Sequence, residues 1–428
     1  MLSLISLISC AVNKKSISYF STLNSRLDTT SVLNSGFSGL VVLDLETGKT
    51  IFNRNPEKYF VSASNTKLFS LYSCLKTLND SIVAFRYTET DSTFTFWGTA
   101  DPTLKHPFFE DAGVIDFLKE KATQKKMVLS NGHVKLPHYG PGWMWDDFDD
   151  YYQAELTSLP LFGNILYVKK DSLSTSFMPN EFVINKEKNY TNRLVKRDLN
   201  LNFFTLPGIL DTIKRFEQEI PYLNAAETNI KLLERLVEDT IYLTNRSIPY
   251  DALTKNSLPM DTVLRRMMQV SDNMLAEHLL LSAGVTLTDS VSLNYALNVI
   301  TSLFLSDLPQ KPIWVDGSGL SRYNRFTPAS IVRLLQKMNH EIPEDRLFSF
   351  FVKDFGKKLP DLPLAVGNKP TIYAKSGSMS GVFNVSGYMI TKKGRKLAFS
   401  FMNNNFEPSV NSARKAVQDI LNEIAKNN

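Results

Sequence analysis

The chain has 428 residues, a formal net charge of +5, five histidines and two cysteines. This length gives room for two or three domains, and the hydrophobic fraction of 43% is typical of a globular protein with an ample core. Two cysteines exclude a disulfide scaffold and a cysteine-rich zinc module, the histidines lack metal-ligand spacing, and the small charge without a basic block gives no indication of nucleic-acid binding.

The chain begins with a short apolar run, MLSLISLISC, which is shorter than the roughly 20 residues that a membrane-spanning helix needs. The run is typical of the apolar region of a secretory signal, and its last four residues are similar to a bacterial lipobox. We therefore expect residues 1–10 to be a lipoprotein signal with lipidation at Cys10, and the polar segment 11–35 to be a tether. The alternative is an apolar N-terminus without such a role. Cys74, in an apolar helical run, is expected to be a small buried hydrophobe.

The elements expected after this segment change in character along the chain. They are, in order, a hairpin over 37–54, a helix over 64–78, short strands separated by turns from about 86 to 205, more helical sequence, two helices over 258–283 interrupted at 271–273, a helix over 327–340, a strand over 371–376, a hairpin, and an amphipathic helix over 409–425.

Antiparallel strands thus occur near both ends of the chain, while the middle is β-rich and different. This order indicates an α+β fold, with residues 36–85 and 250–428 forming one domain and residues 86–249 forming a β-rich insertion.

The first motif that could carry chemistry is Ser64-Asn65-Thr66-Lys67. At i and i+3 on a helix, Ser64 and Lys67 share one face, so a hydroxyl and an amine lie side by side. A serine is a weak nucleophile until a base takes its proton, and a lysine whose pKa is lowered by burial or a nearby positive charge can be that base. The alternative is an N-cap serine followed by a solvated lysine.

Two further motifs lie later in the chain. The SDN sequence at 271–273 offers a hydroxyl for proton relay and an amide for a substrate carbonyl, or it is simply a cap or turn. The KSG sequence at 375–377 offers a positive charge, a hydroxyl for a carboxylate and room for substrate backbone, or it is a strand that ends in a glycine turn. Each motif is weak alone, but the three in this order are the signature of penicillin-binding proteins and serine β-lactamases.

Five stretches carry a closer resemblance, which extends from about residue 35 over nearly the whole chain. They are ASNTKLF at 63–69, DPTL at 101–104, GWMWDD at 142–147, DGSGLSRYN at 316–324 and KSG at 375–377. The chain resembles the D-alanyl-D-alanine carboxypeptidase/endopeptidases of the penicillin-binding protein 4 type, peptidase family S13. This resemblance implies a β-lactamase-like transpeptidase domain with an antiparallel sheet flanked by helices, an inserted domain, and a location in the bacterial periplasm.

The resemblance also implies the catalytic residues. Ser64 would be the acyl-enzyme nucleophile and Lys67 its base. Ser271 and Asn273 would assist proton transfer and position the substrate, and Lys375 would support the electrostatics of the site. The reaction would transfer an acyl group from a D-Ala carbonyl to Ser64 and then to water, with no cofactor.

The substrate carboxylate would be bound by the third motif. Ser376, with Ser378 beside it, would bind the terminal D-Ala carboxylate, and Gly377 would let the substrate backbone approach. The backbone N–H groups of Ser64 and Ser378 would form the oxyanion hole. The chain departs from the family where Ser376 replaces the usual threonine, which keeps the hydroxyl, and where Ser380 stands in place of glutamine.

A side-chain recognition site is implied at three more positions. Some relatives read the diaminopimelate side chain of the peptide with an acidic residue, an aromatic residue and an arginine, which here are Asp147, Tyr152 and Arg322. A carboxylate suits an ammonium and a guanidinium suits a carboxylate. The alternatives are a solvated or calcium-like acidic loop at 146–150, and an arginine that braces its own turn.

The resemblance therefore predicts an enzyme that acts on peptidoglycan peptides and is inhibited covalently by β-lactam antibiotics. The rival hypotheses are a β-lactamase or esterase with the same motifs, and a non-catalytic wall-binding lipoprotein. A histidine-dependent serine hydrolase is disfavoured because the sequence around Ser318, DGSGL, is not the G-x-S-x-G motif.

Overall fold

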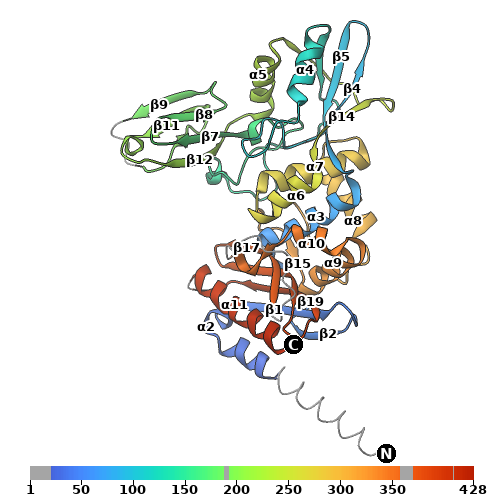
Figure 1. Ribbon diagram of the computed structural model, residues 1–428, viewed down its shortest axis with the longest axis vertical. Helices are drawn as coiled ribbons and strands as arrows, with labels where there is room; N and C mark the ends of the chain where they lie inside the picture. The colour runs from blue at the N-terminus through green and yellow to red at the C-terminus, as the bar shows by residue number, and fades with distance from the viewer. Residues whose placement is uncertain (1–20, 188–191, 357–369, 408) are drawn as a thin grey trace, which may run out of the picture. The chain divides into compact units, whose positions relative to one another are not determined.

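The computed structural model describes residues 21–187, 192–356, 370–407 and 409–428 (Figure 1). Cys10 and the signal expected over residues 1–10 lie outside this part of the chain. The chain forms two compact units. The first comprises residues 1–68, 307–313 and 324–428, and the second comprises residues 69–306 and 314–323.

The first unit is built on a six-stranded antiparallel sheet with the strand order β16-β17-β18-β19-β1-β2. Its strands are β1 (Phe37–Asp44), β2 (Thr50–Arg54), β16 (Val352–Lys353), β17 (Thr371–Met379), β18 (Val382–Ile390) and β19 (Lys396–Asn404). Strand β1 pairs with β19 along its whole length, from Phe37 opposite Asn404 to Asp44 opposite Leu397. Strands from the two ends of the chain therefore share one sheet, as the predicted α+β fold requires.

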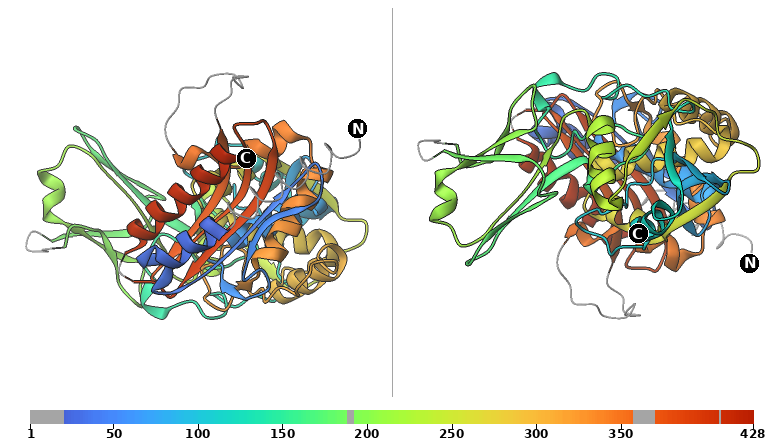
Figure 2. Two further views of the ribbon diagram at one scale, coloured as in Figure 1. Left: turned by 90° about the horizontal axis from the view of Figure 1, so that it is seen from below. Right: turned by 90° about the horizontal axis from the view of Figure 1, so that it is seen from above.

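One face of this sheet is apolar and packs against α11 (Val410–Asn427) and α2 (Ser31–Asn34). Figure 2 shows α11, in dark red, lying across the strands. The helix begins at Ser409, whose Oγ accepts a hydrogen bond from the backbone N–H of Ser412 at 3.2 Å. Its buried residues, including Val417 and Leu421, recur four apart and form the apolar stripe that meets the sheet.

The segment before α2 contributes to the same apolar cluster. Residues 21–29 are helical, and Leu23 and Leu27 are each 1% exposed. Burying two leucines contributes roughly 3–6 kcal/mol. The prediction that residues 11–35 form a tether is therefore wrong for residues 21–35. Leu23 and Leu27 are four residues apart in an otherwise polar sequence, and the helix places them on one face.

The opposite face of the sheet is more polar and carries short elements around Ser64. The first of these is the 3-10 turn η1 (Ala63–Thr66), and α3 (Lys67–Thr77) follows it, with its residues from Phe69 onward in the second unit. The other elements of this unit are β3 (Phe60–Val61), β15 (Arg325–Phe326), α9 (Pro328–Glu341), α10 (Glu344–Ser349) and η5 (Asp354–Gly356). Helix α9 begins as predicted, with Thr327 as its cap and a proline at its first position.

The helical part of the second unit contains α6 (Met260–Gln269), α7 (Asn273–Thr288) and α8 (Leu293–Phe304). Helix α7 is buried on all sides from Met274 to Val285, so its sequence shows no polar face. Cys74 is fully buried beside this helix, and burial raises the pKa of its thiol to about 12. Cys74 is therefore an inert apolar residue, as predicted.

The rest of the second unit is a five-stranded sheet with two smaller sheets beside it, in the orders β13-β6-β5-β4-β14, β12-β7-β8 and β10-β11-β9. Their strands are β4 (Ser81–Glu89), β5 (Thr93–Gly98), β6 (Lys126–Ser130), β7 (Ile165–Lys170), β8 (Thr175–Met178), β9 (Val183–Glu187), β10 (Lys196–Arg197), β11 (Phe203–Pro207), β12 (Phe216–Pro221), β13 (Ile241–Thr244) and β14 (Leu253–Pro259). Helices α4 (Val114–Ala122) and α5 (Ala225–Val237) contact the larger sheet, and the short turns are η2 (Trp145–Asp147), η3 (Phe162–Asn164) and η4 (Gly208–Asp211). This β-rich region spans 81–259, and the second unit that contains it extends over 69–306 and 314–323, beyond the insertion expected at 86–249.

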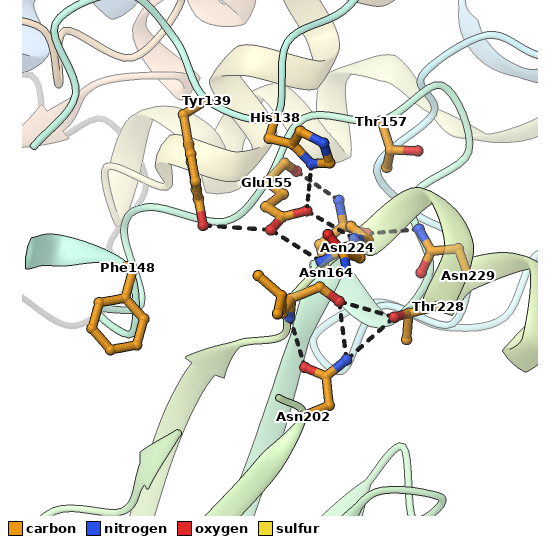
Figure 3. Close-up of polar contacts among 12 residues, drawn as sticks. His138, Tyr139, Phe148, Glu155, Thr157, Asn164, Asn202, Asn224, Thr228 and Asn229 are labelled. Carbon is orange, nitrogen blue, oxygen red and sulfur yellow. Dashed lines mark hydrogen bonds and ion pairs between the residues drawn. The ribbon is translucent and has the colours of Figure 1, made fainter. Parts of the chain in front are cut away.

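Helix α5 is anchored at its first residue by the buried carboxylate of Glu155 (Figure 3). This carboxylate accepts hydrogen bonds from the backbone N–H groups of Asn224 and Ala225 at 3.1 and 2.8 Å. His138 Nδ1 lies 3.2 Å from Glu155 Oε2, and the Tyr139 hydroxyl donates to Oε1 at 3.4 Å. A negative charge at a helix N-terminus is stabilising, so this cluster has a structural role. None of the helices described here is both long and apolar enough to cross a bilayer.

Candidate active site

Ser64 and Lys67 lie side by side at the point where η1 passes into α3. The Lys67 Nζ atom donates a hydrogen bond to Ser64 Oγ at 3.2 Å. Lys67 has no exposed surface, whereas Ser64 is partly exposed. A buried amine in contact with an accessible hydroxyl is the arrangement that proton removal from a serine requires.

The backbone around Ser64 is held by polar side chains of the sheet. Asn65 Nδ2 donates to the carbonyl oxygen of Lys375 at 3.0 Å, and Ser386 Oγ donates to Asn65 Oδ1 at 2.6 Å. Asn384 Nδ2 donates to the carbonyl oxygen of Ser62 at 2.9 Å. Ala63, which precedes the serine, has a φ of 45°. A non-glycine residue in the left-handed region is strained, and these hydrogen bonds hold it in place.

Lys375, on β17, supplies a second amine to the same region. Its side chain is 3% exposed, and its Nζ donates to the carbonyl oxygen of Ser376 at 2.8 Å. Burial holds the pKa of Lys375 well below its usual 10.5, and the nearby charge of Lys67 lowers it further. Because two positive charges close together repel each other, a proton on both lysines at once is disfavoured. This favours a neutral amine near Ser64.

The strand that carries Lys375 lies directly against the serine. A Cβ atom on Gly377 would be 2.7 Å from the backbone nitrogen of Ser64 and 2.9 Å from that of Asn65. No larger residue than glycine fits there without moving the strand. Ser376 and Ser378 are exposed and, by alternation along the strand, occupy the face opposite to Lys375 and Gly377.

Ser271 and Asn273 lie in the second unit, between α6 and α7. Ser271 has a φ of 63°, so the chain turns sharply between the two helices, where the sequence predicts an interruption. Asp272 caps α7, since its Oδ1 accepts the backbone N–H of Leu275 at 3.1 Å. Asn273 Nδ2 donates to the carbonyl oxygen of Tyr152 at 3.1 Å, which brings the second motif next to the predicted recognition residues.

Asp147 is the last residue of η2, and Tyr152 lies in the loop that follows it. Burial raises the pKa of Asp147 above its usual 3.8, and the charges of Asp150 and Asp146 add to this, although a hydrogen bond from Tyr152 opposes it. The Tyr152 hydroxyl donates to Asp150 Oδ2 at 3.0 Å. The negative charges of Asp150 and Asp146 contribute to the raised pKa of Asp147, and a cation beside these carboxylates would offset their repulsion.

Arg322 is exposed on a turn that two buried carboxylates hold together. Glu277 accepts the backbone N–H groups of Gly317 and Ser318, both at 2.8 Å. Asp316 accepts those of Gly319 and Ser321, both at 2.7 Å.

This turn also contacts the loop that leads to Asp147. Trp143 Nε1 donates to Asp316 Oδ2 at 3.1 Å, and Gly142 packs against the ring of Tyr323. Glu277 was not among the residues predicted from the sequence. It is the single acidic residue in the apolar run MLAEHLLLSAG, and such a residue indicates that its carboxylate has a buried polar partner.

The structure thus brings the predicted residues together in two groups, one in each unit. The first unit holds Ser64, Lys67, Lys375, Ser376, Gly377 and Ser378, and the second holds Asp147, Tyr152, Ser271, Asn273 and Arg322. In the described ranges there is no group of three or more histidine, cysteine or acidic side chains that could hold a metal ion.

Comparisons with known proteins agree over nearly the whole chain. The model of the D-Ala-D-Ala carboxypeptidase 3 (S13) family matches residues 21–427. The D-alanyl-D-alanine carboxypeptidase DacB of Haemophilus influenzae is 22% identical over 93% of each chain. The penicillin-sensitive carboxypeptidase A of Dictyostelium discoideum is also 22% identical, over 87% of this chain and 83% of its own. The crystal structure of penicillin binding protein 4 (dacB) from Haemophilus influenzae superimposes with a TM-score of 0.72 at 18% identity and covers 95% of this chain and 99% of its own. This last likeness confirms the predicted fold.

Proposed function

The chain belongs to the D-Ala-D-Ala carboxypeptidase 3 (S13) family and is a serine-type carboxypeptidase, and we propose that Ser64 is its nucleophile. The observation that carries this assignment is the 3.2 Å contact between Lys67 Nζ and Ser64 Oγ, with the lysine fully buried. Lys67 in its neutral form takes the hydroxyl proton as Ser64 Oγ attacks the carbonyl carbon of the penultimate D-Ala. The charge of Lys67 lowers the pKa of Lys375, so the two amines lie close enough to disfavour a proton on both.

The tetrahedral oxyanion is stabilised by backbone N–H groups of Ser64 and Ser378 in this proposal. The close approach of Gly377 to the backbone nitrogen of Ser64 supports it, because a side chain at that position would obstruct the substrate carbonyl. The amide C–N bond then breaks, and D-Ala leaves with a proton. Water attacks the acyl-enzyme, Lys67 takes a proton from that water, and the shortened peptide is released with Ser64 restored.

We assign the remaining predicted residues to substrate binding and proton transfer. Ser271 relays the proton to the departing amine and Asn273 holds the peptide, a role that the strained backbone at Ser271 supports. Asp147 and Tyr152 receive an ammonium group of the peptide side chain, and Arg322 receives its carboxylate.

We further propose that the substrate is a peptidoglycan stem peptide and that the chain acts in the bacterial cell envelope, held by a lipid on Cys10. The Haemophilus influenzae structure in complex with a β-lactam has a TM-score of 0.67, and it supports covalent inhibition of this chain by the same class of compound. Cleavage of a cross-link would follow the same chemistry with a different leaving amine.

Labelling with a fluorescent penicillin tests the nucleophile. We expect the wild type to be labelled and Ser64→Ala not to be. The control Ser73→Ala, on α3 and bonded to the carbonyl oxygen of Phe69, should keep its label. Failure of the wild type to react would indicate a non-catalytic wall-binding protein.

Digestion of purified muropeptides, with products identified by mass, tests the substrate. Loss of one D-Ala from monomers indicates a carboxypeptidase, and conversion of dimers into monomers indicates an endopeptidase. Rapid turnover of a cephalosporin reporter without any release of D-Ala would instead support a β-lactamase.

A further inference from the structure

Asp147 and Tyr152 belong to one loop of the second unit, residues 144–153, which we call the recognition loop. The Gln153 side-chain amide donates to the carbonyl oxygen of Met144 at 2.7 Å, which brings the two ends of the loop together. The loop carries aspartates at 146, 147, 149 and 150, and the charges at 146 and 150 raise the pKa of Asp147. Because these charges repel one another, contacts with neighbouring elements must hold the shape of the loop.

Strand β10 of the β-rich region supplies such contacts. Arg197 is 4% exposed, and its guanidinium donates to four backbone carbonyl oxygens. One of them belongs to Phe148 in the recognition loop and lies 3.1 Å from Nη2. The other three belong to Pro221, Asp198 and Leu199, at 2.8, 2.8 and 3.4 Å. The guanidinium therefore ties the recognition loop to the end of β12 and to the residues after β10.

Two more contacts join the same strand to the loop. The guanidinium carbon of Arg197 lies 4.9 Å from the centre of the Phe148 ring, and Lys196 Nζ lies 3.0 Å from Asp149 Oδ2. Phe148 and Asp149 directly follow Asp147 in the chain. Strand β10 thus fixes the backbone next to the carboxylate that we assign to the substrate ammonium.

An arginine suits this task because its N–H donors lie in one rigid plane. Five donors in a fixed fork can join segments that are distant in the chain, which a flexible lysine cannot do with one nitrogen. The loop is also held from the second motif, since Asn273 Nδ2 donates to the carbonyl oxygen of Tyr152 at 3.1 Å. The recognition loop is therefore held by β10 at Phe148 and Asp149 and by the second motif at Tyr152.

We propose that Arg197, with Lys196, is a positioning residue that holds the recognition loop in the shape in which Asp147 binds an ammonium group of the substrate. This inference rests on the proposed function of Asp147 and adds to it a role for the β-rich region, which is to set the preference for the peptide side chain. Arg197 acts through the backbone of Phe148 and does not touch the substrate.

The test compares an N-acylated peptide ending in L-Lys-D-Ala-D-Ala with the same peptide in which norleucine, which has no ammonium group, replaces the lysine. We expect Arg197→Gln to lower kcat/KM for the lysine peptide by about 10–100-fold, because a shift of about 1 Å misplaces the carboxylate. The norleucine peptide and penicillin labelling should change less than threefold. Lys196→Gln removes a partly exposed charge, and it should lower the preference for lysine by about two- to fivefold.

Arg86→Gln is the matched control. Arg86 lies in the same unit and also donates to backbone carbonyl oxygens, those of Pro249, Tyr250 and Ala252 at 3.3–3.4 Å. Its loss should lower the thermal midpoint and leave the preference for lysine unchanged. The proposal would be overturned by an equal loss with both peptides in Arg197→Gln, or by an equal loss of preference in Arg86→Gln, since Arg197 would then only support the fold.

Asp147→Asn separates failure of this proposal from failure of the proposed function. The variant should lose the preference for lysine, and adding Arg197→Gln to it should lower that preference by less than a further threefold, because both changes affect one contact. If Asp147→Asn keeps the preference, recognition by Asp147 is wrong and the role of Arg197 falls with it. If Asp147→Asn loses the preference while Arg197→Gln and Lys196→Gln keep it, the role of β10 is refuted and that of Asp147 stands.

Discussion

Glu277, on α7, and Asp316, at the start of the turn over 316–321, each accept two backbone N–H groups of that turn. Both carboxylates are at most 1% exposed. Burial, together with the charge of Asp316, raises the pKa of Glu277 from 4.5 to about 8. The turn that presents Arg322 is therefore held by an acidic pair that keeps a proton near neutral pH.

This pair makes the stability of the protein depend on pH. Because Glu277 binds its proton more tightly when folded than when unfolded, its contribution is complete below pH 4.5 and is lost as the pH rises to about 8. We expect the thermal midpoint of the wild type to fall between these values. Glu277→Gln, which cannot ionise, should flatten this part of the profile, whereas Glu57→Gln, on the surface, should not. An unchanged profile in Glu277→Gln would contradict the assignment.

Lys67→Arg should abolish acylation while preserving the positive charge. A guanidinium does not release its proton in this pH range, so Ser64 would lose its base. We expect the rate of penicillin labelling, followed by stopped-flow fluorescence, to fall by about 10²–10⁴-fold. A variant that reacts within tenfold of the wild type would show that another group takes the proton from Ser64.

Gly377→Ala should damage the site without unfolding the protein. The added methyl group would lie 2.7 Å from the backbone nitrogen of Ser64, so β17 must move away, at a cost of about 1–3 kcal/mol. We expect labelling to slow at least tenfold with a thermal midpoint only a few degrees lower. Thr371→Ala, at the start of the same strand, provides the comparison and should label normally.

Glu155→Ala should loosen α5 without affecting catalysis. The substitution leaves the backbone N–H groups of Asn224 and Ala225 without their acceptor, which costs about 1–3 kcal/mol. Hydrogen exchange should quicken across α5 (Ala225–Val237). His138→Ala removes an exposed partner of the same carboxylate and should change the exchange much less. Equal effects of the two variants would mean that the carboxylate does not hold the helix.

Much of the fold could be predicted because its signals are local. Thr327 and Pro328 specify the start of α9, and the break at Ser271 separates α6 from α7 as the sequence indicates. The α-helix predicted from residue 64 begins at Lys67 instead. The turn before it starts at Ala63, whose left-handed backbone is maintained by contacts with distant strands, and such contacts leave no local signal in the sequence.

The site was predictable only as far as its motifs extend. Ser64, Lys67 and Lys375 come from short motifs, and the structure brings them together in one unit. Glu277 belongs to no motif, and only the structure shows that it accepts two backbone N–H groups of the turn that carries Arg322.

The pairing of β1 with β19 has a consequence for how the chain is made. Phe37 and Asn404 are neighbours in the sheet, yet 367 residues separate them along the chain. The strands on which Ser64 rests therefore cannot assemble until the last tenth of the polypeptide has been synthesised, and closing so long a loop is slow. The nucleophile and its base therefore form a site only after nearly the whole chain has been made.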